Sequence, residues 1–240
     1  MRAAYDKIYR ELKSQIEDGT YGYEDFLPSQ AVLVKRFDCA HNTVRKALAM
    51  LAAEGYCQPI HGKGVRVIWR PQDTHSAFTL GGIEPFADTA RRNDLDGGTQ
   101  VKVFEHLVCD EQLAALSGFA VGTELLHVER IRFLDDQALI HDKEYYDAVT
   151  VGDLSPEQAA LSIFSYLEEK RGVRITTSKR TITMELATDE DRAWLDIDGI
   201  DYLAVMAKQT FDGNGHMFNY TQSRHHPSHF RFQLTALRQR

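Results

Sequence analysis

The spacing of apolar residues changes once along this chain of 240 residues, and the change divides it into two parts. Over residues 5–51, apolar side chains recur at intervals of three and four, as on the buried side of an amphipathic helix. Beyond about residue 100 they alternate with polar side chains, as in half-buried strands. We therefore predict a helical domain over residues 1–70, a linker over 71–79 and a larger α+β domain over 80–240.

Charge divides the chain at the same place. The net charge is −7, but residues 1–70 hold 11 Lys and Arg against 8 Asp and Glu, whereas the remainder holds 17 against 27. The basic part can approach DNA, while the acidic part should be repelled by it and is expected to have another role. Three widely spaced cysteines, no leader and no long apolar run predict a cytoplasmic protein.

The first part has the element order of a winged helix-turn-helix. Two helices come first, and Ser29 can cap the second of them. A third helix follows, expected to start at Asn42 because Ala40 is a poor cap, and its buried positions are Val44, Ala47, Leu48 and Leu51. Gly55 can end that helix, and the glycines on either side of Lys63 predict a tight hairpin.

In a winged helix-turn-helix the third helix enters the major groove and the hairpin reaches the DNA backbone or minor groove. Arg45 can then reach guanine or phosphate, Asn42 and Thr43 can reach base edges or phosphate, and Lys63 can contact phosphate. The alternative is that Arg45 and Lys46 merely form a solvated helix face, but element order and basic hairpin tip together favour DNA. The predicted DNA-binding residues are Ser29, His41, Asn42, Thr43, Arg45, Lys46, His61, Gly62 and Lys63.

Four stretches of this part resemble the DNA-binding head of the GntR family of bacterial repressors. They are Leu27-Pro28-Ser29, Asn42-Thr43-Val44-Arg45-Lys46-Ala47-Leu48, Glu54-Gly55-Tyr56 and His61-Gly62-Lys63-Gly64. Two positions depart from the family pattern: Gln30-Ala31 stands where the family usually has Glu-Arg, and Ala40-His41 stands where it usually has Ser-Arg. Because the missing arginines contact DNA in the family, the resemblance implies the same fold with a different operator sequence.

The second part alternates strands and short helices. Strands are expected at about 100–109, 124–133, 138–146, 173–186, 202–211, 216–225 and 230–237, and helices at about 84–92, 110–116, 162–170 and 188–195. Asp135-Asp136 and Asp212-Gly213-Asn214-Gly215 are typical of hairpin turns. This pattern predicts an antiparallel sheet with scattered helices.

The second part resembles the effector-binding UTRA domain of the HutC branch of the GntR family, which has a chorismate-lyase-like fold. The likeness lies in Glu129-Arg130-Ile131-Arg132, His141-Asp142-Lys143-Glu144-Tyr145-Tyr146, Ser162-Ile163-Phe164-Ser165-Tyr166-Leu167-Glu168 and Ser223-Arg224-His225. Within that branch it is most similar to the repressors of trehalose operons. The resemblance implies a homodimeric repressor that binds operator DNA and responds to a phosphorylated sugar, trehalose 6-phosphate.

Arg130 and Arg132 lie two apart on one predicted strand, so both side chains point to the same face and form a possible anion site. The resemblance implies an effector pocket lined by Arg130, Arg132, Asp142, Ser162, Asn219 and Phe230. The alternative is that the two arginines form cross-strand ion pairs with residues such as Glu144. In the stretch before the first helix of this domain, Glu84 would repel a phosphate unless it points away.

Other functions find less support in the sequence. His225, His226 and His229 match no standard metal motif and are interpreted as solvated, so no metal is expected. Asp189-Glu190-Asp191 is interpreted as the acidic first turn of a helix rather than a catalytic group. No catalytic motif and no cofactor site are found, so the chain is not expected to be an enzyme. The alternatives are a regulator of the same type with another effector, such as an amino-acid derivative, and more distantly a small-molecule lyase.

Overall fold

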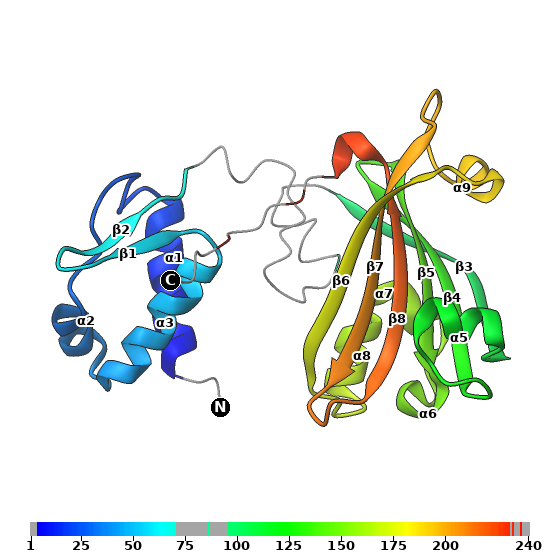
Figure 1. Ribbon diagram of the computed structural model, residues 1–240, viewed down its shortest axis with the longest axis horizontal. Coiled ribbons are helices and arrows are strands. Elements are labelled where there is room, and N and C mark those ends of the chain that lie inside the picture. The colour runs from blue at the N-terminus through cyan, green and yellow to red at the C-terminus, as the bar shows by residue number, and fades with distance from the viewer. Residues whose placement is uncertain (1–3, 71–85, 87–95, 231, 233–235, 237–240) are drawn as a thin grey trace. The chain divides into compact units, whose positions relative to one another are not determined.

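The structure is a computed structural model that describes residues 4–70, 86, 96–230, 232 and 236. The described residues form two compact units (Figure 1). The first contains residues 4–70 with Phe232 and Ala236, and the second contains residue 86 and residues 96–230. The linker predicted over residues 71–79 and the carboxylate of Glu84 lie outside the described residues. No helix in the described part is long and apolar enough to cross a membrane.

The first unit is the predicted winged helix-turn-helix. Its elements are α1 (Ala4–Glu17), α2 (Gln30–Phe37), α3 (His41–Ala53), β1 (Cys57–Ile60) and β2 (Gly64–Val67). The two strands pair as an antiparallel hairpin. The helices share one apolar core, which includes Ile8, Leu12, Ile16, Leu33, Val44, Leu48 and Leu51. Among them, Val44, Leu48 and Leu51 are buried positions that the three- and four-residue spacing predicted for the third helix.

The caps of these helices follow the sequence with one difference. Ser29 caps α2 as predicted, because its hydroxyl accepts a hydrogen bond from the amide of Val32. Helix α3 begins at His41, one residue before the predicted Asn42, although Ala40 offers its first turn no side-chain acceptor. The carbonyl of Ala40 accepts hydrogen bonds from the amides of Thr43 and Val44, so the backbone alone closes this turn.

The second unit is built on one six-stranded antiparallel sheet. Its strands lie in the order β3 (Gly97–Val108), β4 (Glu124–Leu134), β5 (Gln137–Asp147), β8 (Met217–His225), β7 (Tyr202–Asp212) and β6 (Ile175–Leu186). Asp135 and Asp136, both with positive φ, form the two-residue turn between β4 and β5. The cross-strand register aligns Arg130, Asp142 and Ser223 on three neighbouring strands.

Helices cover both faces of this sheet. Helices α6 (Ala148–Val151), α7 (Pro156–Leu161) and α8 (Ile163–Glu169) pack on one face, here the α7 face, around Leu126, Val128, Tyr146 and Phe218. Helices α5 (Glu111–Ser117) and α9 (Asp189–Trp194) pack on the other face, here the α9 face, around Leu125, Ile131, Leu203 and Tyr220. The caps of α5 and α9 are Asp110 and Thr188.

Three details of the second unit differ from the sequence expectation. The strand predicted over 230–237 is wrong for Phe230, Phe232 and Ala236, none of which is in a strand. A 3-10 turn, η2 (Pro227–His229), instead follows β8. Helices α6 and α7 were not predicted at all, and of the helix predicted over 84–92 only Phe86 is described, in helical conformation.

Candidate DNA-binding and effector-binding sites

Helix α3 presents a polar surface opposite its buried side. His41, Asn42, Arg45 and Lys46 are exposed, and Thr43 is half-buried. The ammonium of Lys46 lies 3.7 Å from the ring centroid of Tyr5 on α1, a cation–π contact that orients this side chain. The arrangement provides side chains that can donate to base edges and phosphates.

The hairpin tip carries the other predicted DNA contacts. His61, Gly62 and Lys63 are exposed between β1 and β2. Gly62 has φ of +72° and Gly64 has φ of +119°, so both adopt a backbone conformation that favours glycine. Ser29 is exposed as well, with its hydroxyl engaged in capping α2.

On the α7 face, Arg130 forms a buried bidentate ion pair with Glu144. Its Nε and Nη2 donate to the two carboxylate oxygens at 2.5 and 2.7 Å, and Nη1 donates to the carbonyl of Ala159 at 2.8 Å. Tyr146 donates its hydroxyl to the same carboxylate. The arginine and the glutamate are each only 4% exposed, so this pair is part of the interior.

Arg132 forms a second buried pair, with Asp142. Its Nε donates to Asp142 at 2.8 Å and its Nη1 to the Thr99 hydroxyl at 2.8 Å. The hydroxyl of Ser223 donates to the other oxygen of Asp142 at 2.6 Å. Burial alone would raise the pKa of Asp142, but Arg132 holds that pKa well below its usual range. The cross-strand pairing that the sequence left open for both arginines is thus confirmed, while their part in an effector pocket stays a prediction.

The three other predicted effector residues lie at separate points of this unit. Asn219 is fully buried on β8, where its amide oxygen accepts from the hydroxyls of Thr210 and Thr221. Ser162 caps α8. Phe230 is half-buried, and its ring centroid lies 4.9 Å from that of His225. His225 was interpreted as solvated, and that is wrong, because the last position of β8 faces the sheet interior and leaves this residue only 3% exposed.

Two cations of the α7 face were missed by the sequence reasoning. Lys208 on β7 and Arg180 on β6 lie directly opposite each other, and Lys208 also faces Thr221 on β8. Both side chains are half-buried. The sequence held a signal for Lys208, because this lysine directly follows the apolar run from residue 203 to 207 and shares its strand face with Met206.

The α9 face holds a buried ionic network. His141 is completely buried, with Nε2 at 2.7 Å from Glu129 and Nδ1 at 3.1 Å from Asp191. Burial opposes a charged imidazole, but these two hydrogen bonds outweigh it and raise the pKa of His141. Arg224 donates to Asp191 at 2.8 Å. Because Asp191 is on α9, the network fastens this helix to the sheet.

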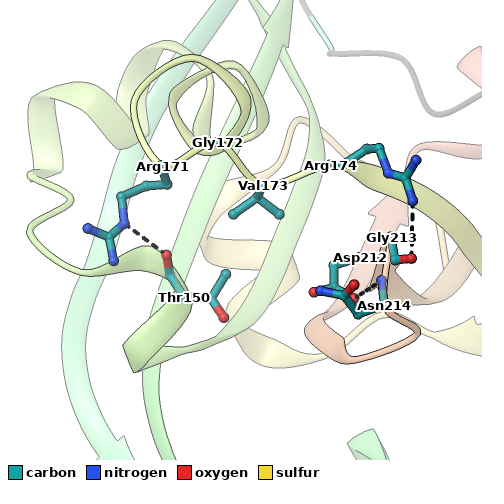
Figure 2. Close-up of a pocket in the computed structure, with 8 residues that line it drawn as sticks. All are labelled: Thr150, Arg171, Gly172, Val173, Arg174, Asp212, Gly213 and Asn214. Atoms are coloured by element: carbon teal, nitrogen blue, oxygen red, sulfur yellow. Dashed lines mark hydrogen bonds between the residues drawn. The ribbon is translucent and has the colours of Figure 1, made fainter.

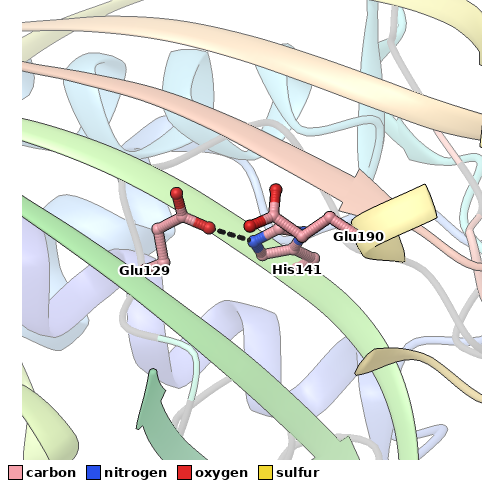
Figure 3. Close-up of side chains that lie close together, drawn as sticks. All are labelled: Glu129, His141 and Glu190. Carbon is pink, nitrogen blue, oxygen red and sulfur yellow. Dashed lines mark hydrogen bonds and ion pairs between the residues drawn. The ribbon is translucent and has the colours of Figure 1, made fainter. Parts of the chain in front are cut away.

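Glu129, His141 and Glu190 come close enough together to suggest a metal site, since one ligand atom of each lies within 4.8 Å of the others (Figure 3). The ammonium of Lys143, however, bonds to Glu190 and lies 3.8 Å from Glu129. A cation therefore already lies among these carboxylates, and the cluster is explained as ion pairing. The acidic first turn predicted at Asp189-Glu190-Asp191 is confirmed.

A polar hollow lies where α8 leads into β6, beside the β7–β8 turn. Figure 2 shows its lining, namely Thr150, Arg171, Gly172, Val173, Arg174, Asp212, Gly213 and Asn214. The two arginines donate to backbone carbonyls of Thr150 and Gly213, each at 3.2 Å. These contacts close loops, and none of the predicted effector residues lines the hollow.

Comparison with known proteins adds to this geometry. Residues 4–67 match the family described as bacterial regulatory proteins, gntR family, and residues 93–231, more than half of the chain, match the UTRA domain. The chain belongs to the GntR family. This GntR protein is a DNA-binding transcriptional regulator with a UTRA domain for a small-molecule effector, so the lyase alternative is wrong.

Individual GntR relatives resemble the chain over nearly its whole length. The HTH-type transcriptional regulator TreR of Bacillus subtilis (strain 168) is 34% identical over 225 residues, which are 94% of this chain and 93% of TreR. The structure of the regulator YydK from Bacillus subtilis has a TM-score of 0.79 at 20% identity, covering 98% of this chain and all of YydK. The effector-binding domain of the B. subtilis trehalose repressor has a TM-score of 0.54 at 31% identity, covering 60% of this chain and 99% of that domain.

Proposed function

We propose that this GntR regulator is a homodimeric repressor of genes for trehalose uptake and breakdown, and that trehalose 6-phosphate releases it from its operator. The observation that carries the proposal is the 34% identity to TreR, which extends over 94% of the chain and so includes both domains. The charge distribution of the sequence agrees with the proposal. The basic first part can bind DNA, and the acidic second part is expected to hold the effector site.

On the DNA side, α3 supplies base contacts through Asn42 and Arg45, and the hairpin tip supplies a phosphate contact through Lys63. All three side chains are exposed. A dimer of such heads binds two half-sites related by two-fold symmetry, so the operator is expected to be an inverted repeat.

On the effector side, the sugar binds over the α7 face. Asp142 and Asn219 belong to its polar floor, and Phe230 offers an aromatic ring for an apolar face of the sugar. Arg130 and Arg132 complete this floor, and Ser162 at the start of α8 belongs to the same side of the sheet.

The test is a gel-shift titration of the operator complex with trehalose 6-phosphate, with trehalose and glucose 6-phosphate as controls. Trehalose 6-phosphate is expected to weaken DNA retention, and unchanged or tighter retention contradicts the proposal. A thermal-shift panel run in parallel identifies the effector, because a ligand at 100 times its Kd stabilises the protein by about 2.7 kcal/mol. If another sugar phosphate or an amino-acid derivative stabilises the protein instead, that compound becomes the proposed effector. The assignment of the protein as a transcriptional regulator would not change.

A further inference from the structure

Acidic and basic side chains alternate across the α9 face of the sheet and form one network. Its carboxylates are Glu105, Glu129, Glu185, Glu190 and Asp191, and its permanent cations are Lys143 and Arg224. Two histidines, His127 and His141, complete it. Among these described residues the carboxylates outnumber the permanent cations, so the network favours protonated imidazoles.

His141 is held between the sheet and α9 by both of its ring nitrogens. Its Nε2 lies 2.7 Å from Glu129 on β4, and its Nδ1 lies 3.1 Å from Asp191 on α9. A neutral imidazole has one N–H donor and one acceptor nitrogen, whereas an ionised carboxylate only accepts. Both contacts are hydrogen bonds at the same time only when the ring carries two protons, that is, when His141 is an imidazolium.

Both carboxylates are held in their ionised form, so neither supplies the second proton. Burial alone would raise the pKa of Glu129, but hydrogen bonds with the two histidines hold that pKa at about 2. Burial would likewise raise the pKa of Asp191, but hydrogen bonds from His141 and Thr188 hold it well below its usual range. Arg224 on β8 also donates to Asp191, at 2.8 Å. The two protons that join α9 to the sheet here therefore belong to His141.

We propose that the contact Glu129–His141–Asp191 is a proton-dependent latch, and that loss of one ring proton from His141 releases α9 from the sheet. With one proton gone, a nitrogen lone pair of a completely buried ring faces a carboxylate oxygen, and that hydrogen bond is lost. The latch lies on the opposite face of the sheet from the proposed sugar site, so this inference does not rest on the proposed function.

Other groups around the ring act on the same equilibrium. Lys143 on β5 disfavours the imidazolium, while Glu190 on α9, which pairs with Lys143, favours it. Trp194 of α9 packs edge-on against the His141 ring, with the two centroids 4.9 Å apart. Trp194 is therefore a reporter for the docking of α9 at this point.

The sign of the pH dependence follows from the contacts of His141. Burial lowers its pKa, but the hydrogen bonds to Asp191 and Glu129 outweigh burial and raise the pKa above the ordinary value of 6.5. The stability that the latch contributes is thus fully present below pH 6.5 and is lost as the pH rises through the raised value. His225 does not interfere, because its pKa of about 4 lies below this range.

The experiment follows Trp194 in full-length Trp69→Phe, which leaves it as the only tryptophan of the chain. Between about pH 7 and 9.5 its emission should shift to longer wavelength and become more accessible to acrylamide, because α9 leaves the sheet. Over the same range the melting temperature should fall by roughly 3–12 °C more than that of Glu129→Gln, the loss expected for one charge-assisted hydrogen bond.

Glu129→Gln is the decisive variant. Its amide nitrogen can donate to the neutral ring, so His141 needs no second proton and α9 should stay docked at pH 9.5. His127→Gln is the matched control, because His127 contacts Glu129 from the other side and otherwise touches Glu105 on β3 and Tyr145 on β5. This control should keep the pH response of wild type.

Three outcomes would overturn the latch. A pH response that Glu129→Gln shares with wild type would place the titrating group elsewhere. A melting temperature that falls while the emission of Trp194 stays constant would mean that the proton leaves only on unfolding. Ring nitrogen NMR of wild type gives an answer even if Glu129→Gln does not fold: His141 should carry a proton on both nitrogens at pH 7, and a ring with one proton contradicts the inference.

Discussion

At the scale of single residues, Arg45 is the side chain on which operator recognition most depends. It is exposed on α3, and a bidentate contact to guanine contributes about 1–3 kcal/mol. Arg45→Ala should therefore lower operator affinity by about five- to 150-fold in a gel shift. Arg10→Ala is the matched control, since Arg10 is an exposed arginine of α1 that pairs with Asp6. If Arg45→Ala binds the operator as tightly as wild type, α3 is not the recognition helix.

A substitution at Glu144 tests how much the buried ion pair with Arg130 contributes to stability. Glu144→Gln leaves the guanidinium of Arg130 buried without its counter-charge, which typically costs about 3–5 kcal/mol. Urea unfolding should show a loss of that size. The double variant Arg130→Met/Glu144→Leu removes both charges and should recover most of it. A single variant as stable as wild type would mean that the pair contributes nothing measurable.

His225 makes the stability of the second unit depend on pH. Burial lowers its pKa from 6.5 to about 4, so the unfolded chain binds more protons between these values. Stability from this group is present above pH 6.5 and is lost as the pH falls towards 4, by about 1.4 kcal/mol per pH unit and about 3 kcal/mol in all. The difference in unfolding free energy between wild type and His225→Asn should follow this slope. A difference that is constant between pH 7 and 4 would contradict the assignment.

At the scale of elements, the sequence predicted most of the helices and strands that a local rule decides, with α7 as an exception. Alternation located the six strands of the sheet, and the Asp135-Asp136 turn fixed one hairpin. Helix α6 was missed because its segment, residues 148–151, contains two valines and a threonine, which favour strands. Helix α7 was missed although Ser155 and Gln158 form a capping box at its start.

The candidate sites also differ in whether local sequence rules or the pairing of strands decides them. The exposed residues of α3 follow from helix periodicity alone, so that surface could be predicted. Which carboxylate pairs with Arg130 depends on the register of β4 against β5, and that register aligns Arg130 with Asp142 while the ion pair runs diagonally to Glu144. The position of Lys208 beside Arg180 likewise depends on the register of β6 against β7, two strands separated by helix α9, and no local pattern specifies that register.

At the scale of the whole molecule, the two domains are expected to be thermodynamically linked. If trehalose 6-phosphate weakens operator binding by some factor, the operator must weaken trehalose 6-phosphate binding by the same factor. Calorimetric titration of the effector into free protein and into the operator complex gives two effector affinities, and their ratio is this factor. Identical effector affinities in the two titrations would show that the domains act independently.

The absence of a side-chain cap at the start of α3 determines one way in which a substitution can stabilise this protein. Ala40 gives the first amides of α3 no side-chain acceptor, and Ala40→Ser should supply one and stabilise the first unit by about 1 kcal/mol. The same amides lie at the amino-terminal end of α3, the helix that we propose enters the major groove, where a partial positive charge favours DNA phosphate. The added hydroxyl would compete for them, so we expect Ala40→Ser to gain melting temperature without gaining operator affinity. The melting temperature of the first unit can therefore be raised by a single substitution, while the strength of DNA recognition is set separately.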